Sequence, residues 1–209
     1  MLASKTVTEL LDAFSSPTPT PGGGSAAALA GAVGASLLAM VAAMPKTKTG
    51  TPEERAALDG VLPKLVAARD RLRALIDEDA ASYDAVVAAY RLPKGTDEEK
   101  AARKAAVARA MQGATDVPLE TARQCSGMFS LARVVADNGN TNAKSDAAVG
   151  IQLVGMAFGG ALLNVKTNLD GLSDQAYAAR VRTEARTLQR SGAELAVALG
   201  ALYDRHLEF

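Results

Sequence analysis

Hydrophobic residues recur along this chain at three- and four-residue intervals, the period of an α-helix, and no β-branched run alternates in the two-residue period of a strand. Ser145 and Ser173 are candidate N-caps. Three pairs have the spacing of an N-terminal capping box: Thr6 with Glu9, Thr51 with Glu54, and Thr96 with Glu99. The pattern predicts a kink near Gly60 and Pro63, and helices near residues 6–15, 25–44, 52–91, 97–113, 118–138, 145–167 and 173–207. With no linker or repeat between them, residues 1–209 are expected to form a single all-α helical bundle domain.

Two of these segments, 25–44 and 145–167, consist mainly of Ala, Gly, Leu and Val. Each approaches the length of a membrane span, but Ala and Gly gain little from lipid. No basic region of the kind that opens a secretory signal precedes the first segment. We therefore expect no membrane association, and two helices at the centre of the bundle, where glycines let neighbouring backbones approach closely.

Composition narrows the function further. The 23 basic and 23 acidic residues balance, and aromatic residues make up only 4% of the chain, so a nucleic-acid partner is not expected. One Cys and one His exclude a zinc site built from these residues, and no ligand spacing indicates another metal. Because the single cysteine cannot form an intrachain disulfide, a cytoplasmic location is expected.

The predicted helix 52–91 carries an apolar stripe that includes Leu75 and Tyr83, and Asp79 falls on it, four residues from each. A carboxylate on an inward face must be paired, hydrogen-bonded or held in a polar cavity. Two interpretations remain open. In the structural one, Asp79 is an internal cap or pairs with Arg69; in the functional one, its shifted pKa makes it an acid or base.

Two other charged residues stand at predicted helix ends. Pro93 ends the long helix and leaves Lys94 on a connecting loop, where solvation is the ordinary interpretation. Asp116 comes just before a predicted helix with Pro118 in its first turn, so Asp116 is expected to be an N-cap or to lie near one.

The richest polar segment, DNGNTNAKSDAAVG, stands at the start of the second Ala/Gly-rich helix. Its polar residues exceed what one cap and a turn require, and include Asn138, Asn140, Asn142, Ser145 and Asp146. Exposed amides at a helix N-terminus, together with such side chains, can bind a polar heterocycle or an anion. At the far end of this helix, Asn164 and Asn168 share one face, and a ligand is one way to satisfy buried amides.

A glycine loop precedes the first Ala/Gly-rich helix and consists of Gly22, Gly23, Gly24 and Ser25. It is not a P-loop, because no Gly-Lys-Ser/Thr follows at the required spacing. It can bring bare backbone close to a ligand, although a simple turn is the ordinary interpretation of such a loop.

In combination, these segments resemble the formiminotransferase-cyclodeaminase C-terminal family. The resemblance covers essentially the whole chain and rests on PTPGGGSAAALAGAVGASL, DAASYDAVVAAYRLPKGTDEEKAAR, TDVPLETARQC, GNTNAKSDAAVG and ALLNVKTNL, in this order. The block AYRLPKGTDEEKAAR is especially similar to the bacterial stand-alone methenyltetrahydrofolate cyclohydrolases of that family. No formiminotransferase domain precedes these segments, which favours the stand-alone type.

The resemblance implies an all-α homodimer that acts on a tetrahydrofolate substrate without metal or nucleotide cofactor. The implied reaction is hydrolysis of 5,10-methenyltetrahydrofolate to 10-formyltetrahydrofolate in one-carbon metabolism. Two alternatives remain: an ammonia-releasing formiminotetrahydrofolate cyclodeaminase, and a helical folate-binding module without catalysis.

For this chemistry we expect Asp79 to take the proton from the attacking water, with its pKa raised by desolvation and Lys94 opposing that shift. Lys94 is expected to polarise the adduct or relay a proton to N5, and Asp146 is the alternative carboxylate. The glycine loop and the start of the second Ala/Gly-rich helix are expected to line one pocket. The predicted substrate-binding residues are Gly22, Gly23, Gly24, Ser25, Asn140, Asn142, Ser145, Asn164 and Asn168.

Overall fold

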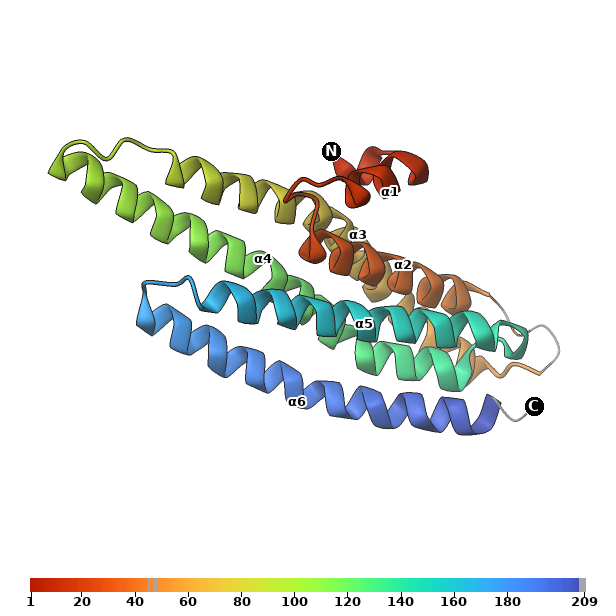
Figure 1. Ribbon diagram of the computed structural model, residues 1–209. Helices are drawn as coiled ribbons and strands as arrows, with labels where there is room; N and C mark the ends of the chain where they lie inside the picture. Colours follow the sequence, from red (N-terminus) through yellow and green to blue (C-terminus); the bar gives the residue numbers. More distant parts are fainter. Residues whose placement is uncertain (45, 47–48, 207–209) are drawn as a thin grey trace.

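The structure is a computed structural model that describes residues 1–44, 46 and 49–206, the backbone alone at residues 191 and 193–206. Its helices are α1 (Val7–Ser15), α2 (Gly23–Ala43), α3 (Pro52–Tyr90), α4 (Asp97–Asn138), α5 (Lys144–Leu169) and α6 (Gln175–His206), with 3-10 turns at Leu2–Ser4 and Thr141–Ala143. The described residues contain no β-strand, which confirms the all-α prediction. α3 and α4 form one long antiparallel hairpin, and α5 and α6 form another (Figure 1).

The helix starts are mostly where the sequence predicts them. Thr6, Thr51 and Thr96 each cap a helix in a complete capping box with the Glu three residues later. The two serine caps are wrong. α5 begins at Lys144, before Ser145. At the start of α6 it is the Asp174 carboxylate, one residue after Ser173, that accepts a hydrogen bond from the Tyr177 N–H at 3.0 Å.

The break predicted between residues 113 and 118 does not occur, because α4 runs unbroken through Pro118. A proline lacks the N–H that would bond the carbonyl four residues earlier, here that of Ala114. The side-chain amide of Asn168 on α5 donates to this carbonyl at 2.7 Å and replaces the missing bond. Asp116 is therefore inside a helix and not an N-cap; its carboxylate accepts a hydrogen bond from the Tyr177 hydroxyl at 2.6 Å.

The two Ala/Gly-rich helices, α2 and α5, pack directly on each other in antiparallel orientation. A Cβ added at Gly34 would lie 2.8 Å from the Gly150 carbonyl oxygen, and one added at Gly150 would lie 3.1 Å from that of Gly34. The first distance is too short for a real Cβ, so Gly34 is needed for this close approach, and the second is tight enough that a side chain at Gly150 would push the neighbouring helix outward. The small-residue contact predicted from the sequence is thus present.

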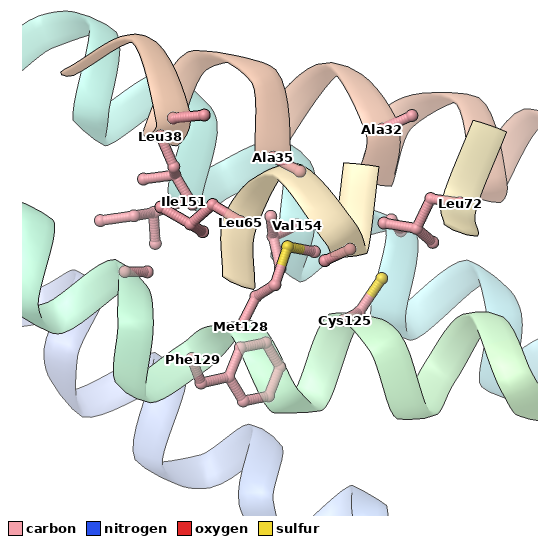
Figure 2. Packing of buried hydrophobic residues seen from close by; sticks show 14 of the residues in the cluster. Ala32, Ala35, Leu38, Leu65, Leu72, Cys125, Met128, Phe129, Ile151 and Val154 are labelled. Carbon is pink, nitrogen blue, oxygen red and sulfur yellow. The ribbon is translucent and has the colours of Figure 1, made fainter. Parts of the chain in front are cut away.

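The main core lies where α2, α3, α4 and α5 meet. Figure 2 shows it: Ala32, Ala35 and Leu38 of α2 face Leu65 and Leu72 of α3, with Cys125, Met128, Phe129, Ile151 and Val154 closing it from α4 and α5. A smaller cluster, with Leu119, Val165 and Val181 among its members, fixes α6 against α4 and α5. Burial raises the pKa of the Cys125 thiol to about 12, so this cysteine is a packing residue.

The outer sides of α2 and α5 remain uncovered. Large apolar side chains there keep between 41% and 67% of their surface exposed, and we call them the α2–α5 apolar face: Val33, Met40, Val149, Met156 and Leu163. Both helices are long and apolar enough to cross a membrane by length and composition alone. Their inner sides contribute to the core, and 56% and 39% of their most apolar stretches are buried.

The connection between α3 and α4 projects beyond the start of α2 (Figure 1). α2 begins at Gly23, beside Asp79 of α3. The last three turns of α3 are therefore not covered by α2. As a result, Tyr83 and Tyr90, predicted on the buried stripe, are 41% and 52% exposed.

Candidate active site at the start of α2

The inward carboxylate of Asp79 meets the first turn of α2. The Ser25 hydroxyl donates a hydrogen bond to Asp79 Oδ2 at 2.8 Å, and Ser25 itself is fully buried. α2 has Gly22 at its N-cap position and no side-chain cap of its own. Asp79 therefore takes the place of a cap from a neighbouring helix, as one of the two sequence interpretations proposed. The alternative partner, Arg69, pairs instead with Asp70.

Gly24 is the residue that lets the carboxylate come this close. A Cβ added at Gly24 would lie 2.6 Å from Asp79 Cγ and would overlap Oδ1. Gly23, by contrast, has ordinary room, since its Cβ would lie 3.5 Å from the side-chain amide nitrogen of Asn164. The segment predicted as a glycine loop is therefore the N-cap and first turn of α2, and Gly24 forms one wall of the carboxylate site.

The environment of Asp79 raises the pKa of its carboxyl group. Burial raises the pKa of this carboxyl above its usual value of 3.8, and hydrogen bonds from the side chain and backbone of Ser25 oppose the rise. The direction agrees with the prediction, but the opposing group is Ser25 and not Lys94. The carboxylate remains partly exposed, so it can still reach a bound molecule. A carboxylate with a raised pKa that still reaches solvent can accept a proton from water.

The asparagines at the end of α5 lie on the same side of the bundle. The Asn164 side chain stands against Gly23 and donates to the Gly160 carbonyl at 2.9 Å. Asn168, one turn later, donates its side-chain amide to the Ala114 carbonyl that Pro118 leaves without a partner in α4. Asn164 therefore lies at the Asp79 site. The amide nitrogen of Asn168 is already bonded to the backbone of α4, and its binding of a ligand stays a prediction.

A shallow groove adjoins the site on the outer surface. It has a volume of about 210 Å³, and its lining consists of Gly23, Ala26, Ala27, Ala30, Met156, Ala157 and Gly160. This lining is almost wholly apolar and leads from the start of α2 onto the α2–α5 apolar face.

The structure does not bring Lys94 to this carboxylate. Tyr90, on the same face of α3, lies about 16 Å along the helix from Asp79, at 1.5 Å per residue. Lys94 lies beyond it and, with Tyr90, lines a separate cavity of about 450 Å³ at the end of the α3–α4 hairpin. Within one chain, Lys94 is therefore too far away to relay a proton at Asp79.

The second predicted cluster, around residues 140–146, lies at the opposite end of the α2–α5 pair. Asp146 is on the first turn of α5, and Asn164 is 18 residues further along the same helix, about 27 Å away. Asn142 and Ser145 are exposed, and the Asn140 side chain accepts from the Asn142 N–H at 3.0 Å. A single pocket lined by both clusters does not form within one chain.

Sequence reasoning missed two features of this site. It treated Ser25 as a loop residue and gave it no link to Asp79, because the two are 54 positions apart and only helix packing joins them. It also placed Tyr83 and Tyr90 in the core. The glycines at 22–24 could have indicated the exposed positions of the two tyrosines, because they mark where α2 begins. Beyond that point α2 no longer covers α3.

Comparisons with known proteins place this geometry in a family. A model of the formiminotransferase-cyclodeaminase family matches residues 6–187. The chain is 42% identical to a methenyltetrahydrofolate cyclohydrolase of Methylorubrum extorquens, across 100% of this chain and 97% of that protein. It is 32% identical to formimidoyltransferase-cyclodeaminases of Gallus gallus and Sus scrofa, across 84% and 91% of this chain but only 32% and 35% of those proteins.

The fold has a solved counterpart. The crystal structure of formiminotetrahydrofolate cyclodeaminase from Thermotoga maritima superposes with a TM-score of 0.86 and covers 99% of this chain, at 22% sequence identity. This likeness concerns the fold, while the match of the family model over residues 6–187 concerns the sequence itself. On the sequence match, the chain belongs to the formiminotransferase-cyclodeaminase family.

Proposed function

We propose that this protein is a methenyltetrahydrofolate cyclohydrolase, which hydrolyses 5,10-methenyltetrahydrofolate to 10-formyltetrahydrofolate. The observation that carries the proposal is the partly buried Asp79 carboxylate at the start of α2, with its pKa raised by burial. The proposal is also supported by the sequence, because the whole chain is 42% identical to a methenyltetrahydrofolate cyclohydrolase.

The reaction needs one group that can move a proton twice. The bridging carbon of the substrate is a cationic amidinium, and a nearby carboxylate stabilises that charge. Asp79 takes a proton from water as the oxygen bonds to this carbon, which gives a neutral tetrahedral adduct. The protonated Asp79 then donates to N5 while the bond from carbon to N5 breaks. The hydroxyl proton leaves to solvent, so that one water is consumed and one proton is released.

Ser25 and Gly24 hold this carboxylate in place for both transfers. The Ser25 hydroxyl fixes the orientation of Asp79 Oδ2, and Gly24 leaves the space in which the carboxylate sits. Lys94 takes no part in either proton transfer, because it lies at the other end of the exposed stretch of α3. Neither step calls for a metal or nucleotide cofactor.

Cyclodeamination of formiminotetrahydrofolate is the second candidate, because it passes through a similar adduct and is in the names of other relatives. Two assays on the purified protein separate the candidates. One follows the absorbance of methenyltetrahydrofolate at a pH where spontaneous hydrolysis is slow, and the other follows ammonia release from formiminotetrahydrofolate. We expect fast decay in the first and none in the second. Rapid ammonia release without accelerated hydrolysis would make the protein a cyclodeaminase, and neither activity would leave a folate-binding module.

We further propose a cytoplasmic homodimer that pairs two α2–α5 apolar faces. α2 carries no charged residue, and Val149, Met156 and Leu163 recur every seven residues along α5, as packed helices require. In a twofold dimer with antiparallel faces, residues 140–146 of the partner subunit would approach the Gly22–Ser25 end of this one. The two predicted binding clusters would then share one pocket across the interface.

The interface is tested by placing a charge at its centre. Met156→Glu puts two carboxylates near each other in a twofold contact, and we expect a monomer by light scattering at micromolar concentration. Lys64→Glu on α3, which reverses an exposed charge outside the face, is the matched control and is expected to stay dimeric. A monomeric unmodified protein would contradict the dimer, and a fully active Met156→Glu monomer would contradict the shared pocket.

A further inference from the structure

A groove runs between α5 and α6, the two helices of the second hairpin (Figure 1). Its volume is about 640 Å³, which is within the range of small-molecule sites. Leu162 and Lys166 line it, and each is two residues from Asn164, about 200° around α5. The groove therefore lies on the side of α5 that faces away from the Asp79 site, and the proposed reaction does not use it.

One part of the groove is apolar. Phe158 lines it and is only 6% exposed, while Leu163 at its edge keeps 67% of its surface exposed. Leu162, also in the lining, is partly buried and packs against the main core. Just past the last lining residue of α6, the helices come close together, since a Cβ added at Gly192 would lie 2.9 Å from the Phe158 ring. An apolar group bound here would be shielded from water by both helices.

The other part of the groove is positively charged. Its cations are Lys166 of α5 and Arg182 and Arg186 of α6, and none of the three forms an ion pair within the part of the chain that the structure describes. Arg182 and Arg186 are one turn apart on the same face of α6, where like charges repel each other. Asp170 is the only carboxylate among the described lining residues. Three cations against one carboxylate favour a bound anion, which would relieve this repulsion.

The charged and apolar parts follow one another along the groove. Val165 and Val181 pack in the same small cluster, so their neighbours Lys166 and Arg182 lie at the same level of the hairpin. Phe158 comes eight residues before Lys166 on α5, about 12 Å along the helix. The groove thus offers a position for a charged head and, next to it, an apolar channel of about that length.

We propose that this groove binds a small organic anion with one carboxylate head and a straight apolar chain, the chemistry of a medium-chain fatty acid. The carboxylate lies between Lys166 and Arg182, and the chain extends past Leu162 to Phe158. A neutral apolar ligand would leave the cations without a counter-charge, and a compact anion such as phosphate would leave the apolar part in water. A flat membrane surface fits less well than a single chain, because Phe158 lies deep in the groove.

Calorimetry with decanoate tests the head and the chain separately. We expect one decanoate to bind per chain of the unmodified protein, and hexanoate to bind at least about 10-fold more weakly, because its shorter chain buries less apolar surface. Decylamine, which has the same chain and a positive head, should not compete. Arg182→Ala/Arg186→Ala should weaken decanoate binding by about 10-fold. Arg91→Ala/Arg109→Ala removes two exposed arginines outside the groove and should keep the affinity.

A second variant fills the groove and leaves its charges in place. Gly159 lines the groove, and a Cβ there would meet nothing within 4 Å, so Gly159→Phe adds a ring to the apolar part without a clash at Cβ. Gly127→Phe on α4, with the same free space and outside the groove, is the matched control. Decanoate binding should be lost in the first variant and kept in the second, and circular dichroism checks that both are folded.

Three results would overturn the proposal. The first is an absence of saturable decanoate binding to the unmodified protein. The second is undiminished binding in Gly159→Phe or in Arg182→Ala/Arg186→Ala, which would place the ligand elsewhere. The third is arginine-dependent binding to phosphatidylglycerol vesicles without binding of free decanoate, which would make this surface a membrane contact.

Discussion

The two ends of the α2–α5 pair carry the same kinds of residue in very different settings. At one end, Asp79 is partly buried, is bonded to Ser25 and lies against Gly24. At the other end, Asp146 stands on the first turn of α5 beside Asn142 and Ser145, which are exposed. General-base chemistry is favoured by a desolvated, fixed carboxylate, and we therefore propose Asp79 as the base and a binding role for the Asp146 end.

Replacing each carboxylate by its amide tests this assignment most directly. Asp79→Asn keeps the shape but removes the base, so we expect kcat to fall by about 10²- to 10⁴-fold. Asp146→Asn removes only a contact to the substrate, so its effect should be under about 10-fold and confined to KM. Turnover of methenyltetrahydrofolate is measured for both, and circular dichroism checks that each is folded. Near-normal turnover in Asp79→Asn with a collapse in Asp146→Asn would exchange the two roles.

The next largest effect is expected from Gly24. Gly24→Ala adds a methyl group where the Asp79 carboxylate lies, so the carboxylate must move. A displacement of about 1 Å at a catalytic group costs on the order of 10²-fold in rate. Gly159→Ala is the matched control, because a Cβ there meets nothing within 4 Å. The kcat of both variants is measured, and normal turnover in Gly24→Ala would show that the position of Asp79 is not critical.

The exposed end is probed by a pair of neighbouring asparagines. The Asn140 side chain accepts from the Asn142 N–H, so Asn140→Ala is expected to loosen the turn and lower Tm. The side chain of Asn142 is exposed, so Asn142→Ala should leave Tm within about 2 °C and raise KM by about 3- to 10-fold. Thermal unfolding and steady-state kinetics give both numbers. An unchanged KM in Asn142→Ala would remove this end from the binding site.

The sequence predicted local features better than those that depend on packing. Capping boxes at Thr6, Thr51 and Thr96 are local, and all three are confirmed. The continuity of α4 was missed because its Pro118 is accommodated by Asn168, 50 residues later in the chain. A proline by itself predicts the end of a helix, because it leaves one backbone carbonyl without a hydrogen bond. Only the packed structure brings the Asn168 amide to that carbonyl.

The same distinction holds within the site. The inward position of Asp79 followed from helical periodicity, and the raised pKa followed from burial. Lys94 was assigned to the same site because it is close in sequence, yet a helix advances 1.5 Å with each residue and carries the lysine to another cavity. Proximity in sequence at the end of a long helix is therefore weak support for a shared site.

The smallest expected effect is on stability, and it has a definite pH window. Because the pKa of Asp79 is raised in the folded protein, the folded state holds this proton more tightly than the unfolded state. The unmodified protein therefore loses stability as pH rises from the usual value of 3.8 through the raised value, by about 1.4 kcal/mol per pKa unit. Asp79→Asn carries no ionisable group there and escapes this loss. Above the window its Tm should exceed that of the unmodified protein, by about 2 to 4 °C per kcal/mol.

Thermal unfolding between pH 4 and pH 8 measures this difference, and Ser25→Ala provides the control. The Ser25 hydroxyl lowers the pKa of Asp79 by bonding its charged form, so its removal should extend the window of lost stability to higher pH. If the difference in Tm between Asp79→Asn and the unmodified protein is the same at every pH in this range, the Asp79 carboxyl has its ordinary pKa in the folded state. In that case Asp79 would resemble a solvated carboxylate, and the contrast between the two ends of the α2–α5 pair would rest on Gly24 alone.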